Sequence, residues 1–325
     1  MAKSKKTRRK EPKVVATVLP VKEASPKKNG VLIFFLFVLV IFTSVEIFMV
    51  AQQKIKQNKR PEFIMSWPSE YKKGLTSMGE YGDFIYGVEN TSTGLVYKID
   101  KKDGSLAFLF QLPELVYSAV QDSKGDIYIL DKKNTIHVFG PDNKLKKKIN
   151  VDDAKTAGWI EVDSKDNFYV VDLTSSIITK YDPNFKKIFS FGGRGIGNEN
   201  FTNVGKVFDG PNDQLYCVNM LDENKAQIKI FDSNGKYKKS WLIKNVKKFT
   251  FLENLAILPD GYVYLNSFAD SLIYVFDNNG KFKGTFDTDI GKKFLITSPS
   301  SITGGKNGII YVATHDLVAF KPIKY

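Results

Sequence analysis

The fold of this chain is decided by a ten-residue pattern that recurs along its length. Residues 122–131 read Asp-Ser-Lys-Gly-Asp-Ile-Tyr-Ile-Leu-Asp, a polar turn followed by a short apolar strand. Similar segments surround five further tyrosines, and the full set is Tyr86, Tyr128, Tyr169, Tyr216, Tyr264 and Tyr311. Successive tyrosines are 42, 41, 47, 48 and 47 residues apart. Five near-equal intervals of this length indicate six repeated supersecondary units.

Each unit continues into further short strands. After a polar turn comes a second alternating strand, as at residues 228–232 and 272–277, and then an Asn/Asp/Gly turn and an outer strand, as at 281–286. This period-two alternation between turn residues is typical of antiparallel strands, and no segment after residue 61 has a helical period. Four strands per repeat predict an all-β fold, a six-bladed β-propeller.

The repeats resemble NHL repeats. Residues 122–131 and 163–172 match the family's turn, apolar strand and closing Asp, and the Gly-rich stretch 191–201 resembles its inter-blade linker. The resemblance covers roughly residues 76–320, and the marks of WD40 and kelch repeats are absent. Membership would imply a β-propeller. Some members are lyases or lactonases with a channel metal, and some bind RNA.

The ring needs a strand from the other end of the chain. The sixth repeat offers three strand candidates, residues 300–303, 309–313 and 317–320, and stops before a fourth. Residues 62–67 are rich in apolar side chains and belong to no repeat. We therefore expect residues 62–67 to form the outer strand of the last blade, which would cover an otherwise unpaired edge.

Residues 31–51 have the length and composition of a transmembrane helix. Leu, Ile, Val and Phe dominate, and Glu46, close to the end, is the one charge. As a helix the segment would rise about 31 Å, close to the thickness of the bilayer core. The run is longer than a signal-peptide core and lacks a small-x-small cleavage site, which predicts an uncleaved anchor.

Charge flanking this segment predicts its orientation. Residues 1–30 hold ten Lys or Arg against two acidic residues, and only four basic residues follow between 52 and 60. The positive-inside rule then places the N-terminus in the cytoplasm and the propeller outside, periplasmic or extracellular. The expected organisation is a disordered basic tail (1–30), the helix (31–51), a linker (52–60) and the propeller (61–325).

Composition argues against several functions. The net charge is +13, but residues 31–325 carry only +5, so nucleic-acid binding by the propeller is not expected. The single cysteine, Cys217, excludes an intramolecular disulfide and reads as a small buried side chain. The two histidines, His137 and His315, stand at non-equivalent positions and cannot supply a histidine metal cluster. No catalytic set or cofactor is expected, although an all-oxygen calcium site stays open.

Residues that obey the repeat are interpreted as structural, and those that break it as candidates for binding. The polar residues three positions after the tyrosines (Glu89, Asp131, Asp172, Asn219) are expected to cap turns. Aligning the innermost strands predicts a ring near the channel entrance, made of Thr76, Ser118, Trp159, Gly205, Asn254 and Ser301. Trp159 breaks that ring, either as a packing residue or as an aromatic anchor. The candidate binding face comprises Trp159, Arg194, Lys206 and Asn254.

These observations favour a membrane-tethered binding or scaffold module for a protein or carbohydrate partner. A propeller enzyme, a lyase or hydrolase with a channel metal, is the first alternative. An RNA-binding NHL domain is the second, and it would show a salt-dependent affinity for RNA.

Overall fold

The computed structural model describes residues 43, 45–47, 62–67, 75–90, 94–246, 249, 254–269, 271–286, 289–290, 294–295, 299–304, 308–314 and 316–322. The chain divides into two compact units, residues 1–58 and 59–325. The four described residues of the first unit are helical and exposed. Among described residues no helix is long and apolar enough to cross a membrane. The predicted tail, the linker and most of the predicted helix 31–51 lie outside the described residues.

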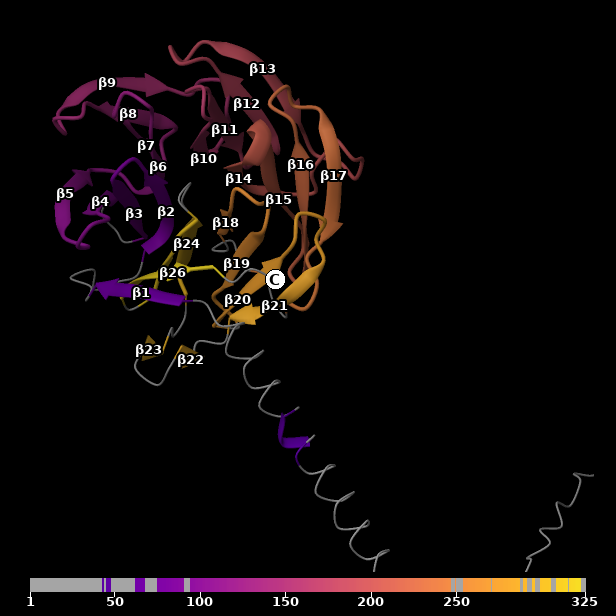
Figure 1. Ribbon diagram of the computed structural model, residues 1–325. Helices are drawn as coiled ribbons and strands as arrows, with labels where there is room; N and C mark the ends of the chain where they lie inside the picture. Colours follow the sequence, from indigo (N-terminus) through magenta and orange to yellow (C-terminus); the bar gives the residue numbers. More distant parts are fainter. Residues whose placement is uncertain are drawn as a thin grey trace, which may run out of the picture. The chain divides into compact units, whose positions relative to one another are not determined.

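Residues 59–325 contain six four-stranded antiparallel sheets, the blades of a propeller (Figure 1). Blade 1 is β2 (Leu75–Tyr81), β3 (Phe84–Asn90), β4 (Gly94–Asp100) and β5 (Leu106–Leu112). Blade 2 is β6 (Val116–Gln121), β7 (Ile127–Asp131), β8 (Thr135–Phe139) and β9 (Leu145–Asn150). Blade 3 is β10 (Ala157–Val162), β11 (Phe168–Asp172), β12 (Ile177–Tyr181) and β13 (Lys187–Gly192).

The later blades follow the same order. Blade 4 is β14 (Val204–Gly210), β15 (Gln214–Asp222), β16 (Lys225–Phe231) and β17 (Tyr237–Leu242), with a 3-10 turn at Pro211–Asp213. Blade 5 is β18 (Leu255–Ile257), β19 (Val263–Ser267), β20 (Leu272–Phe276) and β21 (Phe282–Phe286). Blade 6 is β24 (Ser301–Gly304), β25 (Ile310–Ala313), β26 (Leu317–Lys321) and β1 (Glu62–Trp67). A two-stranded sheet, β22 (Asp289–Ile290) and β23 (Phe294–Leu295), lies between blades 5 and 6 in sequence.

The ring closes through the N-terminal strand. β1 pairs antiparallel with β26, from Glu62 opposite Lys321 to Trp67 opposite Leu317. The inner strands β2, β6, β10, β14, β18 and β24 each contact the next around the ring, and β24 contacts β2. The prediction that residues 62–67 form the outer strand of the last blade is confirmed. Closure covers the edge of β26 that the last repeat leaves unpaired.

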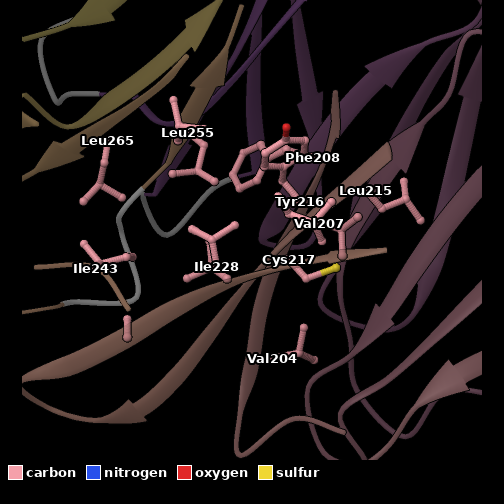
Figure 2. Packing of buried hydrophobic residues seen from close by; sticks show 14 of the residues in the cluster. Val204, Val207, Phe208, Leu215, Tyr216, Cys217, Ile228, Ile243, Leu255 and Leu265 are labelled. Carbon is pink, nitrogen blue, oxygen red and sulfur yellow. The ribbon is translucent and has the colours of Figure 1, made fainter. Parts of the chain in front are cut away.

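The hydrophobic core lies between neighbouring blades. Because each blade is covered on both faces, β7 and β11 are buried at every position, and their sequences are almost entirely apolar. One cluster joins blades 3, 4 and 5 around Cys217, Val207 and Ile228 (Figure 2). Cys217 is fully buried, as expected, and burial raises the pKa of its thiol well above the ordinary value.

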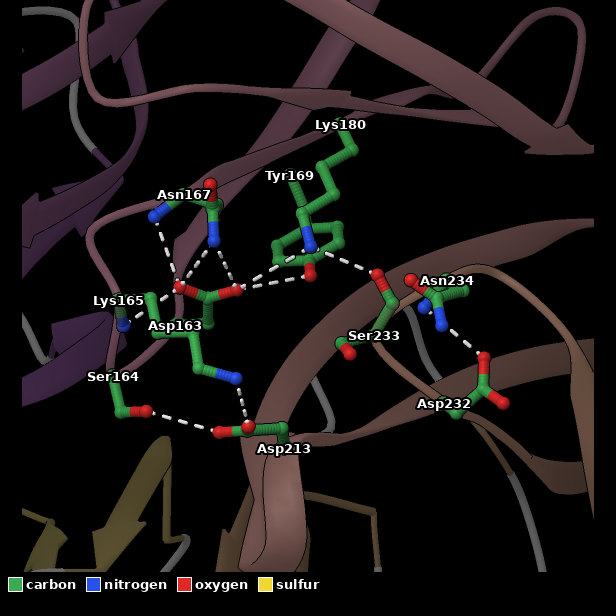
Figure 3. A network of polar contacts seen from close by, with 10 residues as sticks. All are labelled: Asp163, Ser164, Lys165, Asn167, Tyr169, Lys180, Asp213, Asp232, Ser233 and Asn234. Atoms are coloured by element: carbon green, nitrogen blue, oxygen red, sulfur yellow. Dashed lines mark hydrogen bonds and ion pairs between the residues drawn. The ribbon is translucent and has the colours of Figure 1, made fainter.

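The turn aspartates explain why Asp and Tyr recur six residues apart. The Asp163 carboxylate accepts hydrogen bonds from the backbone N–H groups of Lys165 and Asn167, both at 2.9 Å, and from the Tyr169 hydroxyl at 3.0 Å (Figure 3). The Lys165 ammonium and the Ser164 hydroxyl then reach Asp213 of blade 4 at 2.6 and 3.0 Å. The motif therefore caps its own turn and ties it to the next blade.

Two of the residues that follow the tyrosines, Asp131 and Asp172, cap turns as predicted, whereas Glu89 accepts a hydrogen bond from the Tyr97 hydroxyl of the neighbouring strand. Asp131 accepts hydrogen bonds from the N–H groups of Lys133 (2.8 Å) and Thr135 (2.9 Å) in the turn after β7. Asp172 holds the N–H groups of Thr156 and Thr174, both at 3.0 Å. These local bonds satisfy backbone donors between the strands.

Candidate binding face at one end of the ring

The inner strands of blades 1 to 4 carry a β-bulge that decides which side chains line the ring. In blades 2 and 3 the extra residue sits immediately before Ser118 and Trp159. In blade 1 the extra residue is Thr76, so Ser77 takes the ring position opposite Val88. The sequence alignment, which chose Thr76 and Gly205, was therefore wrong by one residue in two blades. The bulge adds one residue without changing the apolar pattern around it.

In blade 4 the same shift brings Lys206 into the ring. Val204 lies opposite Asn219 and Val207 opposite Cys217, so Lys206 stands next to Val207 where Trp159 stands in blade 3. The corrected ring reads Ser77, Ser118, Trp159, Lys206, Asn254 and Ser301. Its positions lie where the inner strands begin. We call this end of the ring the start face. The opposite end, where turns such as residues 122–125 and 163–166 follow the inner strands, is the turn face.

Trp159 is packed into the wall of the ring. It is 4 % exposed, and its indole N–H donates a hydrogen bond of 2.8 Å to the carbonyl of Val207 in blade 4. Its ring lies 5.7 Å from that of Phe208. The side chain therefore joins blades 3 and 4, and little of it reaches solvent in the unbound chain.

Lys206 and Asn254 belong to the same ring and link blades 4, 5 and 1. The Lys206 ammonium donates to the Asn254 amide oxygen at 2.7 Å and lies 4.8 Å from the centre of the Trp159 ring. The Asn254 amide nitrogen donates to the carbonyl of Thr76 at 3.3 Å. The Ser301 hydroxyl, fully buried in the same ring, makes no hydrogen bond to any described residue. An ammonium, an amide and hydroxyls are groups that recognise anionic or hydroxyl-bearing ligands.

Arg194 lies on the start face but outside the ring. Its guanidinium donates to the carbonyl of Thr174 at 2.8 Å and to the Asn203 amide oxygen at 3.0 Å. The Gly-rich inter-blade linker around it, residues 191–201, is held by Lys229. The Lys229 ammonium donates to the carbonyls of Gly197 (2.8 Å) and Asn200 (2.5 Å). Burial lowers the pKa of Lys229. Hydrogen bonds thus hold the inter-blade linker in place, and Ile196 on it is 100 % exposed.

A second cluster, which the sequence analysis missed, lies at the turn face. The Tyr81 hydroxyl of blade 1 donates a 3.0 Å hydrogen bond to the Glu161 carboxyl of blade 3, bridging across blade 2. Burial, and then the charge of Asp209, raise the pKa of Glu161 to about 8. Burial and Glu161 also raise the pKa of Tyr81. The signal available in sequence was an acid inside the inner-strand run Trp-Ile-Glu-Val at 159–162, which the analysis did not weigh.

From the sequence His137 was interpreted as a surface or sheet-edge side chain, but it is buried and hydrogen-bonded to Asp131 at 2.8 Å. His315 lies outside the described residues. Across the described part of the chain, no group of three or more His, Cys, Asp or Glu side chains could hold a metal ion.

Comparison with known proteins shows the fold. No protein-family model matches the sequence, and no curated protein does. Among solved structures, a catalytically inactive virginiamycin B lyase from Staphylococcus aureus bound to quinupristin is 15 % identical with a TM-score of 0.54, covering 79 % of this chain and 83 % of that one. A protein of unknown function from Bacteroides caccae is 12 % identical with a TM-score of 0.53, covering 69 % and 80 %. Likeness at this identity supports the six-bladed propeller fold alone.

Proposed function

We propose that this chain is a membrane-tethered propeller of the NHL type that lies outside the cytoplasmic membrane and binds a protein or carbohydrate partner on its start face. The observation that carries the binding role is the position of the candidate residues. Trp159, Arg194, Lys206 and Asn254 are scattered in sequence, yet all four stand at the end of the ring where the inner strands begin. Lys206 donates to Asn254 and lies over the Trp159 ring, so these three side chains hold one another in place, which lowers the entropic cost of binding.

The tether rests on the sequence of residues 31–51 and its flanking charge. An apolar run of bilayer length, with ten basic residues before it, supports a single-pass anchor with the N-terminus in the cytoplasm. Val45 and Ile47, which belong to this run, are 48 % and 70 % exposed and helical. Such side chains suit a lipid environment. Residues 1–30 would then meet anionic lipid on the cytoplasmic side, and residues 52–60 would link the anchor to the propeller.

The NHL assignment rests on the turn motifs. In support of it, the Asp163 carboxylate accepts the Tyr169 hydroxyl, and Lys229 donates to a carbonyl of the glycine-rich stretch. At Gly192 the backbone φ is +89°, and an added Cβ would lie 2.7 Å from the Phe201 ring, so glycine is required there.

A photoreactive residue at position 194, with a matched one at Lys124 on the turn face, tests the binding face in native membranes. We expect a discrete adduct from position 194, none from position 124, and loss of the adduct when Lys206→Met is added. Equal adducts from both positions, or an adduct indifferent to Lys206→Met, would place the binding surface elsewhere.

The second candidate is a propeller enzyme, and the turn face favours it. Glu161, with a pKa of about 8 and a hydrogen bond from Tyr81, would stay protonated at neutral pH and could donate a proton. Metal analysis of the purified full chain distinguishes the two. A stoichiometric bound metal would favour the enzyme, and a metal-free chain that still forms the position 194 adduct would favour the binding module.

A further inference from the structure

The outer strand of blade 1 differs from those of the other blades. β5 reads Leu-Ala-Phe-Leu-Phe-Gln-Leu and carries no charged side chain. Each of β9, β13, β17 and β21 contains lysine, and β1 begins with a glutamate. Charged residues on an edge strand, lysine above all, oppose the addition of another strand. β5 alone among these outer strands lacks that protection.

Three large apolar side chains of β5 are exposed. Leu106, Phe108 and Leu109 are 39 %, 38 % and 40 % exposed. Within its sheet β5 pairs only with β4, so no described strand pairs with the backbone groups along its outer edge. Phe108 and Leu109 are consecutive, so they stand on opposite faces of the strand. An added strand would therefore meet Leu109 on one face and Phe108 on the other.

Charge next to this edge indicates the kind of strand that fits. Phe139 of blade 2 packs on Phe110 of β5, with ring centres 4.9 Å apart. His137 stands on the same face of β8 as Phe139, and Lys148 on β9 is its cross-strand partner, so Lys148 faces blade 1. Lys148 is exposed and forms no ion pair with a residue that the structure describes. Phe108 and Lys148 lie on the facing surfaces of blades 1 and 2, so a carboxylate on the Phe108 face of an added strand would be turned toward this ammonium.

We propose that the edge of β5 binds an extended segment of a protein partner, which joins blade 1 as a fifth strand. The segment carries apolar side chains on the Leu109 face and acidic side chains on the face toward Lys148. Backbone hydrogen bonds supply much of the affinity, and the alternating side chains supply the specificity. A second copy of the chain would bring no acid on its own β5, and a lipid surface would not use the backbone groups.

The test uses the full chain in phosphatidylcholine nanodiscs and three labelled hexapeptides. One alternates Val and Glu, the second has the same sequence with N-methylated amides on its pairing edge, and the third alternates Val and Lys. We expect the Val–Glu peptide to bind and to slow hydrogen exchange of residues 106–112. The other two should bind at least about tenfold more weakly, because two or three backbone hydrogen bonds or the charge contact are lost.

Substitutions locate the site. Leu109→Lys should abolish binding of the Val–Glu peptide, whereas Leu242→Lys, at the 48 % exposed end of the outer strand of blade 4, should leave it unchanged. Lys148→Glu should reverse the preference toward the Val–Lys peptide. Binding that survives N-methylation or Leu109→Lys overturns the proposal. So does protection of residues 106–112 that needs phosphatidylglycerol in the disc, which indicates a lipid surface, or a dimer that Leu109→Lys dissociates, which indicates a second copy.

Discussion

Replacing Glu161 with glutamine should change how the stability of the propeller depends on pH. Burial and the charge of Asp209 raise the pKa of Glu161 from its ordinary 4.5 to about 8, so the folded chain keeps this proton between the two values while the unfolded chain releases it. The free energy of unfolding therefore falls as pH rises from about 4.5 to about 8, and it stays low above that range.

The size of the effect follows from the two pKa values. They differ by about 3.5 pH units, and each unit is worth about 1.4 kcal/mol, so the upper limit is about 5 kcal/mol. Relaxation around a buried carboxylate reduces this, and we expect about 2–5 kcal/mol. In Glu161→Gln the amide oxygen can still accept the Tyr81 hydroxyl, so the hydrogen bond of 3.0 Å is retained. The variant should match the parent within about 1 kcal/mol near pH 5 and exceed it by about 2–5 kcal/mol at pH 9.

Urea unfolding of a fragment spanning residues 59–325, repeated from pH 5 to pH 9, measures this difference. Glu114→Gln is the matched control, since Glu114 is partly exposed and pairs with Lys133 at the surface. Asp209→Asn should lower the midpoint of the pH dependence without removing it, because burial is the larger cause. Parent and Glu161→Gln curves that stay parallel over the whole range would refute the account of Glu161.

Three further predictions concern closure, the linker and the anchor. Deleting residues 61–68 should lower the melting temperature or cause aggregation, because it exposes Val318 and Phe320 on β26, and an unchanged melt would contradict closure by β1. Lys229→Met should speed proteolytic cleavage within residues 193–200 several-fold, because it removes the donor to three backbone carbonyls. The control Lys225→Met, which removes an exposed ion pair with Asp222, should not change the cleavage rate. Equal cleavage of the two variants would show that Lys229 does not hold the inter-blade linker. Mass spectrometry of the mature protein should find residues before Val31, and a chain beginning near Gln52 would mean a cleaved signal peptide.

Much of the fold could be predicted because the period of propeller repeats can be read directly from the sequence. The six tyrosines, the Asp turns and the apolar second strands follow from local chemistry: a carboxylate satisfies turn donors and a strand covered on both faces reads as continuously apolar. Closure by residues 62–67 could be inferred because the last repeat lacks a fourth strand, while residues 62–67 form a predicted strand that belongs to no repeat.

The candidate sites were less predictable. A bulge adds one residue within an unchanged apolar pattern, so the sequence could not tell Thr76 from Ser77 or Gly205 from Lys206. The contact between Tyr81 and Glu161 joins residues 80 positions apart across an intervening blade, and repeat alignment carries no information about it. The edge of β5 could not be predicted before the fold assigned which strand of each blade is outermost.

Labelling of introduced cysteines in intact cells tests most directly whether the propeller lies outside the membrane. Ile196→Cys places a thiol at a fully exposed position of a rigid loop, and Ala16→Cys places one in the N-terminal tail. The native Cys217 is fully buried, so it contributes little background. With a membrane-impermeant maleimide we predict that the position 196 thiol is labelled in intact cells and that the position 16 thiol is labelled only after permeabilisation. The reverse pattern would contradict an extracytoplasmic propeller, and so would labelling of neither thiol before permeabilisation.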